Sequence, residues 1–304
     1  MIYTCTFNPA LDYKFKLNDL KIGGLNRIDN HLFVIGGKGI NVSLLLNNIG
    51  VDSVAIGFLG GFVGDYIETE INSKPNIVSK FIRVEGTTRI NLKVKSSEIE
   101  TEVNANGPAI NNGDFDKLLE LIDKFSKEDY LIISGSDPKG IANSYKIITN
   151  LCKEKGINFI VDSYGNNLLS TLENKPFLIK PNIHELEETF GFDSNGLDDV
   201  VKYGSKLKEL GALNVLISLG SEGAVLITKN KVLKASAPKG EVKNTTGSGD
   251  SMVAGFVSKF IECNDFKESL KYAVASGSAS AFSDYIAKKE EIEGLLDLIE
   301  VNEV

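Results

Sequence analysis

From residue 114 onward, short apolar runs of strand length alternate with longer stretches whose apolar residues recur at helical spacing. The strand-like runs are 130–134, 157–162, 177–180 and 214–218. Each run is apolar on both faces, as is typical of strands that helices cover on both sides. Glycines stand where the intervening helices should end, at Gly156, Gly191 and Gly211. The pattern predicts an α/β fold built on a parallel sheet sandwiched by helices.

A second pattern interrupts this alternation before residue 104. In the segment 89–95, one face carries Ile90, Leu92 and Val94, and the other carries Arg89, Asn91, Lys93 and Lys95. Alternation resumes over 98–103, after a Ser96-Ser97 turn. The region therefore predicts an antiparallel hairpin with one wet face and one apolar face. The apolar face needs cover, either from the main domain or from the same sheet of a second chain.

Two more short runs, 12–15 and 33–35, are also strand-like. With the hairpin they predict a small antiparallel sheet. We expect it to form a lid over the carboxyl edge of the parallel sheet, because ligands of open α/β folds bind at that edge. We expect one domain over residues 1–304, with lid strands at about 12–18, 31–36 and 88–104. The block 288–304 has apolar spacing that predicts a solvated terminal helix.

Composition excludes several classes of protein. The net charge is −8 and basic residues form no block, which argues against nucleic acid or anionic lipid as a partner. The least polar stretch, 54–64, is far shorter than the roughly 20 apolar residues that span a bilayer. Three cysteines, widely spaced and odd in number, fit a reducing cytoplasm better than a disulfide framework. With two histidines, no His/Cys zinc cluster can form.

The most informative stretch is 244–250, Asn-Thr-Thr-Gly-Ser-Gly-Asp, which leads into a helical apolar pattern over 251–261. A Gly-Ser-Gly turn that opens a helix presents unpaired backbone N–H groups, with the positive end of the helix dipole behind them. Anions bind at such a place. The alternative is a plain loop in which Asp250 is the helix N-cap.

A second glycine-rich stretch, 36–41, reads Gly-Gly-Lys-Gly-Ile-Asn and again precedes a helical run. Its glycines allow a ligand to approach the backbone closely, and Lys38 and Asn41 supply a charge and an amide. A tight strand-to-helix turn explains the same residues equally well. Asp12 is the last residue of the segment Asn-Pro-Ala-Leu-Asp. It can accept hydrogen bonds from two sugar hydroxyls, or it can be an ordinary turn residue after a strand.

Two later loops carry weaker signals. Asn182 and Glu185 lie three residues apart at a helix start, where they can hold a hydrated magnesium ion or form a capping box. The loop 218–223, Ser-Leu-Gly-Ser-Glu-Gly, lies between two strands and suits contact with a nucleotide or a plain turn.

In this order the segments resemble the ribokinase-like family of carbohydrate kinases over essentially the whole chain. Segments 36–41 and 245–250 are similar to the two signatures of that family. The closer resemblance is to its branch of 1-phosphofructokinases and tagatose-6-phosphate kinases. It rests on the segments 8–12, 23–27, 60–64, 87–91, 101–104, 134–136 and 180–186. Segments 57–67 and 88–95 are more similar to the 1-phosphofructokinases.

The resemblance implies ATP-dependent, magnesium-requiring phosphorylation of fructose 1-phosphate at its 6-hydroxyl. Asp250 would be the general base, and the amides of Gly247, Ser248 and Gly249 would face the transferring phosphoryl group. The residues implied to bind the sugar phosphate are Asp12, Arg27, Gly37, Lys38, Asn41 and Arg89, with Arg27, Arg89 and Lys38 facing its phosphate. A homodimer formed through the lid sheet is implied as well.

For the nucleotide, the resemblance implies contact with Asn182, Ser218, Leu219, Gly220, Ser221, Glu222, Gly223 and Gly249. Glu185 and Asn182 would organise water around magnesium. The chain departs from the branch at Ala105 and Asn106, where Gly-Pro is more usual, and this could alter how the lid meets the sugar. The alternatives are a tagatose-6-phosphate kinase and a sugar-phosphate-binding regulator without turnover, and the intact Asp250 argues against the regulator.

Overall fold

In the computed structural model, which describes residues 1–18, 20–96 and 100–304, ten strands form a large sheet in the order β14-β13-β12-β11-β10-β9-β8-β1-β4-β5. Seven of these strands run parallel: β1 (Ile2–Thr6), β4 (Ser53–Leu59), β5 (Ile77–Arg83), β8 (Tyr130–Ser134), β9 (Asn158–Asp162), β10 (Leu178–Ile179) and β11 (Val215–Ser218). The predicted parallel core is confirmed, and its strands end within a residue or two of the predicted bounds.

One edge of the large sheet is antiparallel. It consists of β12 (Ala224–Ile227), β13 (Val232–Ala235) and β14 (Val301–Glu303). The terminal helix predicted over 288–304 is wrong, because that block divides into the short helix α10 (Lys289–Glu293), a 3-10 turn (Leu296–Leu298) and β14. Ile299, which ends the 3-10 turn, and Val301 of β14 are both buried, so the apolar residues of this block pack on the core without forming one helix.

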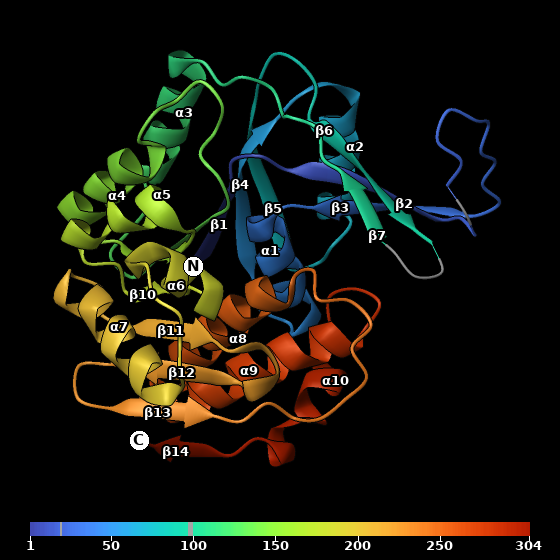
Figure 1. Cartoon of the computed structure of the whole chain (residues 1–304). Helices are drawn as coiled ribbons and strands as arrows, with labels where there is room; N and C mark the ends of the chain where they lie inside the picture. The colour runs from blue at the N-terminus through green and yellow to red at the C-terminus, as the bar shows by residue number, and fades with distance from the viewer. Residues whose placement is uncertain (19, 97–99) are drawn as a thin grey trace.

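Helices cover both faces of the large sheet (Figure 1). One face packs against α1 (Lys38–Asn48), α2 (Gly61–Asn72), α8 (Ser248–Cys263), α9 (Phe266–Phe282) and α10. The other face packs against α3 (Asn112–Ile122), α4 (Ser144–Lys155), α5 (Gly165–Leu169), α6 (Ile183–Phe190) and α7 (Leu197–Glu209). Gly156 and Gly191 end α4 and α6 in the left-handed region, as predicted.

The second sheet has four strands, β3-β2-β6-β7, and extends from the side of the main body in Figure 1. Its strands are β2 (Ala10–Lys16), β3 (His31–Gly36), β6 (Arg89–Lys95) and β7 (Glu100–Val103). The β6–β7 pair is the predicted antiparallel hairpin, β2–β3 is also antiparallel, and β2–β6 is parallel. The predicted turn at Ser96-Ser97 and the start of the second strand at Glu98 lie partly outside the described residues. We refer to these four strands as the lid.

Candidate active site

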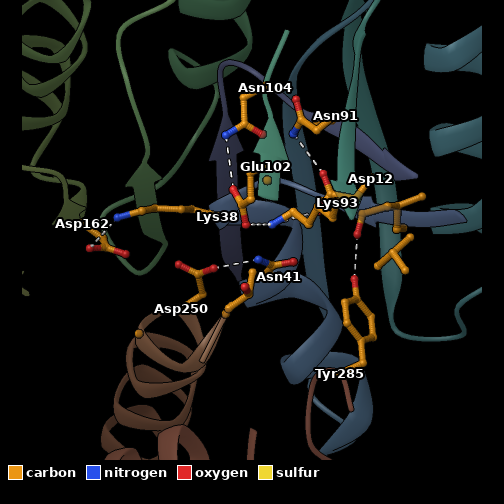
Figure 2. Close-up of a pocket in the computed structure, with 18 of the residues that line it drawn as sticks. Asp12, Lys38, Asn41, Asn91, Lys93, Glu102, Asn104, Asp162, Asp250 and Tyr285 are labelled. Atoms are coloured by element: carbon orange, nitrogen blue, oxygen red, sulfur yellow. Dashed lines mark hydrogen bonds and ion pairs between the residues drawn. The ribbon is translucent and has the colours of Figure 1, made fainter. Parts of the chain in front are cut away.

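A cavity of about 470 Å³ lies between the lid and the carboxyl edge of the large sheet. Its lid wall is the polar face of the alternating strands, including Asp12, Arg89, Asn91, Lys93 and Glu102. Its floor comes from the strand ends and helix starts of the main body (Figure 2). The wet face of the hairpin therefore faces the cavity, and the lid covers the sheet edge where the sequence places it.

Asp250 lies in the first turn of α8 and is buried. Gly247 is the helix N-cap, with a φ of +84° that favours glycine, so the alternative in which Asp250 caps the helix is wrong. The Asp250 carboxylate instead lines the cavity, and its Oδ2 accepts a hydrogen bond of 2.8 Å from the Asn41 side-chain amide (Figure 2). The two glycine-rich segments thus meet at this carboxylate.

The electrostatic surroundings raise the pKa of Asp250 to about 6. Burial is the main cause, and the nearby Asp162 carboxylate adds to it, whereas Lys38, Asn41 and Lys180 act in the opposite direction. A carboxylate with a pKa near neutrality, in a cavity, is well matched to the work of a general base.

The turn before Asp250 offers backbone N–H groups to the cavity. Gly247 and Gly249 line it, and they stand at the positive end of the α8 dipole. Ser248 does not line the cavity, and its N–H donates to the Thr245 carbonyl at 3.2 Å. The Ser248 N–H therefore already has a partner, and the anion site on this turn stays a prediction that Gly247 and Gly249 are placed to serve.

At the lid end of the cavity, Asp12 is held in place by its neighbours. Its Oδ1 accepts a 2.9 Å hydrogen bond from Asn91, and Lys93 lies 3.7 Å from Oδ2. Lys93 also pairs with Glu102 at 2.8 Å, and Asn104 donates to the same carboxylate (Figure 2). This network fixes a carboxylate where hydroxyl groups of a polar ligand can donate to it.

The basic residues predicted for the ligand's phosphate separate in space. Arg89 lines the cavity, and its Nε is buried with no hydrogen-bond partner among the described residues. Lys38 also lines the cavity, but its Nζ lies 3.4 Å from Asp162 at the Asp250 end, away from the lid. Arg27 is exposed on the loop that joins β2 to β3 and does not line the cavity of its own chain. That loop leads away from the main body in Figure 1.

Asn182 and Glu185 form a reciprocal capping box at the start of α6. The Asn182 side chain accepts from the Glu185 N–H, and the Glu185 carboxylate accepts from the Asn182 N–H, each at 2.8 Å. The capping alternative is therefore confirmed. Both side chains also line the cavity, so capping and ligand binding coexist here.

The predicted nucleotide loop is a 3-10 turn between β11 and β12. Ser218 lines the cavity, whereas the rest of the segment, 219–223, lies beyond its wall. Gly220, Ser221 and Glu222 are exposed, which leaves this turn open to a ligand larger than the cavity itself.

The structure adds cavity residues that the sequence analysis did not single out as site residues. Those with polar side chains are Lys14, Asn91, Lys93, Glu102, Asn104, Asp162, Lys180, Thr246 and Tyr285. Asp162 ends β9 and Lys180 directly follows the neighbouring parallel strand β10, so the order of the strands in the sheet would have brought the two together. Tyr285 follows α9 and donates to the Ile35 carbonyl at 2.7 Å, a contact between distant segments that no local pattern indicates.

A carboxylate suited to proton abstraction, a helix-start anion site and a polar lid in one cavity are parts that the transfer of a phosphoryl group to a hydroxyl group requires. The model of the pfkB family carbohydrate kinases matches residues 6–289. The chain belongs to that family.

Two sequence relatives and one solved structure show which kinases the chain is similar to. The chain is 41% identical to the 1-phosphofructokinase of Bacillus subtilis over 302 residues, covering 99% of each chain. It is 35% identical to a tagatose-6-phosphate kinase of Staphylococcus epidermidis over 320 residues, covering 99% of this chain and all of that one. The solved structure of phosphofructokinase-2 from Escherichia coli in complex with substrates and products matches with a TM-score of 0.90 at 28% identity, covering 98% of each chain. In the described residues, none of the helices combines the length and apolar character needed to cross a membrane.

Proposed function

We propose that this chain transfers the γ-phosphoryl group of ATP to the 6-hydroxyl of fructose 1-phosphate, giving fructose 1,6-bisphosphate and ADP. The observation that carries the proposal is the buried Asp250 carboxylate, which faces the same cavity as the Gly247–Gly249 turn and the Asp12 carboxylate of the lid. The 41% identity to a 1-phosphofructokinase, against 35% to a tagatose-6-phosphate kinase, supports the choice of sugar.

In this reaction Asp250 accepts the proton of the 6-hydroxyl while the oxygen attacks phosphorus, a role typically worth ~10² to 10⁴ in rate. The N–H groups of Gly247 and Gly249 stabilise the charge on the phosphoryl oxygens. Asp12, Asn41 and the backbone at Gly37 hold the sugar hydroxyls. Phosphoryl transfer depends mainly on such positioning and charge neutralisation.

The residues present fit a hydrated magnesium ion. Among the described residues, no group of three Asp, Glu, His or Cys side chains could bind a metal by itself. Magnesium instead keeps several waters and uses one or two protein oxygens together with substrate phosphates. Glu185 and Asn182 offer such oxygens on the cavity wall and would act through water. When bound, the ion would supply positive charge to the phosphate oxygens of ATP.

The nucleotide would extend from the cavity over Asn182 and Ser218 and along the exposed turn 219–223. We also propose that residues 1–304 form one kinase domain with an inserted lid, and that it works in the cytoplasm, where ATP is available. The three cysteines are free, which fits that compartment.

The reaction is tested by mixing the purified protein with ATP and fructose 1-phosphate and following the phosphate resonances by phosphorus NMR. The proposal predicts a second sugar phosphomonoester resonance at the 6-position that grows in step with ADP. A product phosphorylated at another position, or ADP without a new sugar resonance, would contradict it.

The acid side of the pH profile follows from the Asp250 pKa. We expect kcat/KM to fall as the pH drops through about 6, because the protonated carboxyl cannot accept the hydroxyl proton. A phosphate monoester of the substrate also titrates near pH 6. The Asn41→Leu variant separates the two causes. Loss of the Asn41 hydrogen bond, which favours the ionised Asp250, should move the fall in activity to higher pH. A profile that does not shift in this variant would assign the fall to the substrate.

We further propose a homodimer formed through the lid. On the face opposite the cavity, one register row across the four strands consists of Phe33, Tyr13, Leu92 and Val103. Leu92 is 38% exposed, Phe33 44% and Val103 56%. The main body covers this row only at Phe33, whose ring lies 6.3 Å from that of Tyr66 in α2. A second copy of the same sheet would cover the row. Arg27 of each copy would then lie near the cavity of the other copy.

Replacing Leu92 by Glu should split this dimer, because a charge would have to be buried in the centre of the row. Light scattering at tens of micromolar should change from about twice the 33.0 kDa chain mass to that mass, and sugar binding should weaken at the same time. Val78→Glu, on an exposed position of β5, serves as the control and should leave the mass unchanged. A wild-type protein that runs as a monomer would contradict the dimer.

A further inference from the structure

One aromatic side chain of the cavity reaches from the main body to the lid. Tyr285 lies just after α9, and its hydroxyl donates to the Ile35 carbonyl of β3 at 2.7 Å (Figure 2). Because β3 is the edge strand of the lid, this hydrogen bond joins an edge of the lid to the main body. Such a contact can serve stability alone, or it can also place the hydroxyl for a ligand.

The segment that carries Tyr285 is fixed beside the glycine turn of α8. Ile286 and Ala287 are buried, and the Asn48 side chain in α1 donates to their carbonyls at 3.4 and 3.0 Å. A Cβ built on Gly247 would come within 2.8 Å of the Ile286 Cδ1. The tyrosine is therefore held at a set place relative to the turn that precedes the general base.

The hydroxyl of Tyr285 is close to the groups proposed to hold the sugar. The Ile35 carbonyl to which it donates belongs to the same peptide group as the Gly36 N–H, and a Cβ built on Gly36 would lie 3.6 Å from the Asp12 Oδ2. Burial raises the pKa of Tyr285 above its ordinary value, and the Asp12 and Asp250 carboxylates add to this effect. The hydroxyl is therefore near both carboxylates and stays protonated.

The chemistry of this hydroxyl limits what it can bind. A phenolic hydroxyl has one hydrogen to donate, and its oxygen can also accept. The Ile35 carbonyl takes the hydrogen, so a ligand in the cavity meets the lone pairs of the oxygen. Those lone pairs require a donor, and the two nearby carboxylates disfavour an anion. A neutral hydroxyl group of the sugar fits this position, whereas its phosphate does not.

The positions of the carboxylates indicate which hydroxyl this is. Asp250 faces the 6-hydroxyl in the proposed reaction, and Asp12 holds ring hydroxyls from the lid. A group near both carboxylates meets the ring hydroxyl that is nearest to C6. In a ketohexofuranose this is the 4-hydroxyl, because C4 is bonded to C5 and C5 carries C6.

We propose that the Tyr285 hydroxyl accepts a hydrogen bond from the 4-hydroxyl of the furanose, and that it thereby selects the configuration at C4. Fructose and tagatose differ only at this carbon, and in tagatose the 4-hydroxyl points to the opposite face of the ring. Tyr285 is then a specificity-determining residue that contacts the acceptor. The inference rests on the proposed phosphoryl transfer to a ketohexose phosphate.

The test compares Tyr285→Phe with the wild type on fructose 1-phosphate and on 4-deoxyfructose 1-phosphate. On fructose 1-phosphate the variant should lose roughly 5- to 100-fold in kcat/KM, as removal of one partner of a buried hydrogen bond does. On the 4-deoxy sugar it should match the wild type within about twofold, because the donor is absent. The preference for fructose 1-phosphate over tagatose 1-phosphate should shrink by the same factor as the first loss.

The matched control is Tyr130→Phe, which removes a half-buried hydroxyl at the amino end of β8, away from the cavity. It should equal the wild type on all three sugars. An equal loss in Tyr285→Phe on fructose 1-phosphate and on its 4-deoxy analogue would show that the hydroxyl only ties the lid to the main body, and it overturns the proposal. A loss below twofold on fructose 1-phosphate overturns it as well.

Binding without turnover gives a second readout. Calorimetry without ATP should show that the wild type binds 4-deoxyfructose 1-phosphate at least fivefold more weakly than fructose 1-phosphate. A wild type that binds both equally overturns the proposal even if Tyr285→Phe does not fold, which circular dichroism checks.

Failure of the proposed acceptor is distinguishable from failure of the inference. If the wild type phosphorylates fructose 1-phosphate but the 4-deoxy comparison fails, the proposed function stands and the tyrosine assignment falls. If the wild type prefers another ketohexose phosphate, the proposed acceptor fails, and the same comparison between that sugar and its 4-deoxy analogue decides the role of Tyr285. A wild type that phosphorylates no sugar phosphate overturns both.

Discussion

Asp250→Asn should keep the fold and lower kcat by roughly 10² to 10⁴. The amide has the size of the carboxylate and still fits beside Asn41, but it cannot take the proton of the attacking hydroxyl. The KM for ATP should stay within a few-fold, because the lost interaction belongs to the chemical step and not to nucleotide binding. Steady-state kinetics with both substrates varied measures the two parameters.

The matched control for this variant is Asp116→Asn, which makes the same change at an exposed position of α3. It should retain the wild-type kcat. If the Asp250→Asn enzyme keeps a tenth of wild-type kcat, Asp250 is not the general base, because loss of a general base costs roughly 10² or more in rate.

Arg89→Ala should raise the KM for fructose 1-phosphate by roughly 10- to 150-fold, which corresponds to the ~1.5 to 3 kcal/mol of a hydrogen bond to a charged group. The guanidinium lies on the polar face of β6, donates to the Asn8 carbonyl at 3.2 Å and has a buried Nε with no partner among the described residues. Burial lowers its pKa, and the Asp12 carboxylate acts in the opposite direction.

Arg83→Ala removes an arginine at the end of β5 that pairs with Asp65 and Glu68 and does not line the cavity. Its KM for the sugar should remain that of the wild type. If Arg89→Ala also left the KM unchanged, Arg89 would be structural and the phosphate of the sugar would need a different partner.

The sequence predicted the features that depend on local periodicity. The strand bounds 130–134 and 89–95 match β8 and β6 residue for residue, because strict apolar or alternating patterns specify a strand and its buried face. Asp250 and Asn41 meet because each lies in the first turn of a helix that begins at the same edge of the large sheet, and Asp12 lines the same cavity from the lid strand β2.

The errors occur where distant segments decide the outcome. The apolar spacing of 288–304 is compatible with a helix, and only the open edge beside β13 makes residues 301–303 a strand. Arg27 stays a prediction, because it does not line the cavity of its own chain and would reach one only in a second copy. The pairing of Asp162 with Lys38 depends on the position of β9 beneath the start of α1, which no spacing along the chain reveals.

The central claim concerns the acceptor, and a coupled ADP-release assay tests it most directly. The assay compares fructose 1-phosphate, fructose 6-phosphate, tagatose 6-phosphate and tagatose 1-phosphate at equal concentrations over a range that gives kcat/KM for each. The account predicts the highest kcat/KM for fructose 1-phosphate, by at least tenfold over fructose 6-phosphate and tagatose 6-phosphate. A higher kcat/KM for tagatose 6-phosphate, or ADP release that no sugar phosphate stimulates, would contradict it.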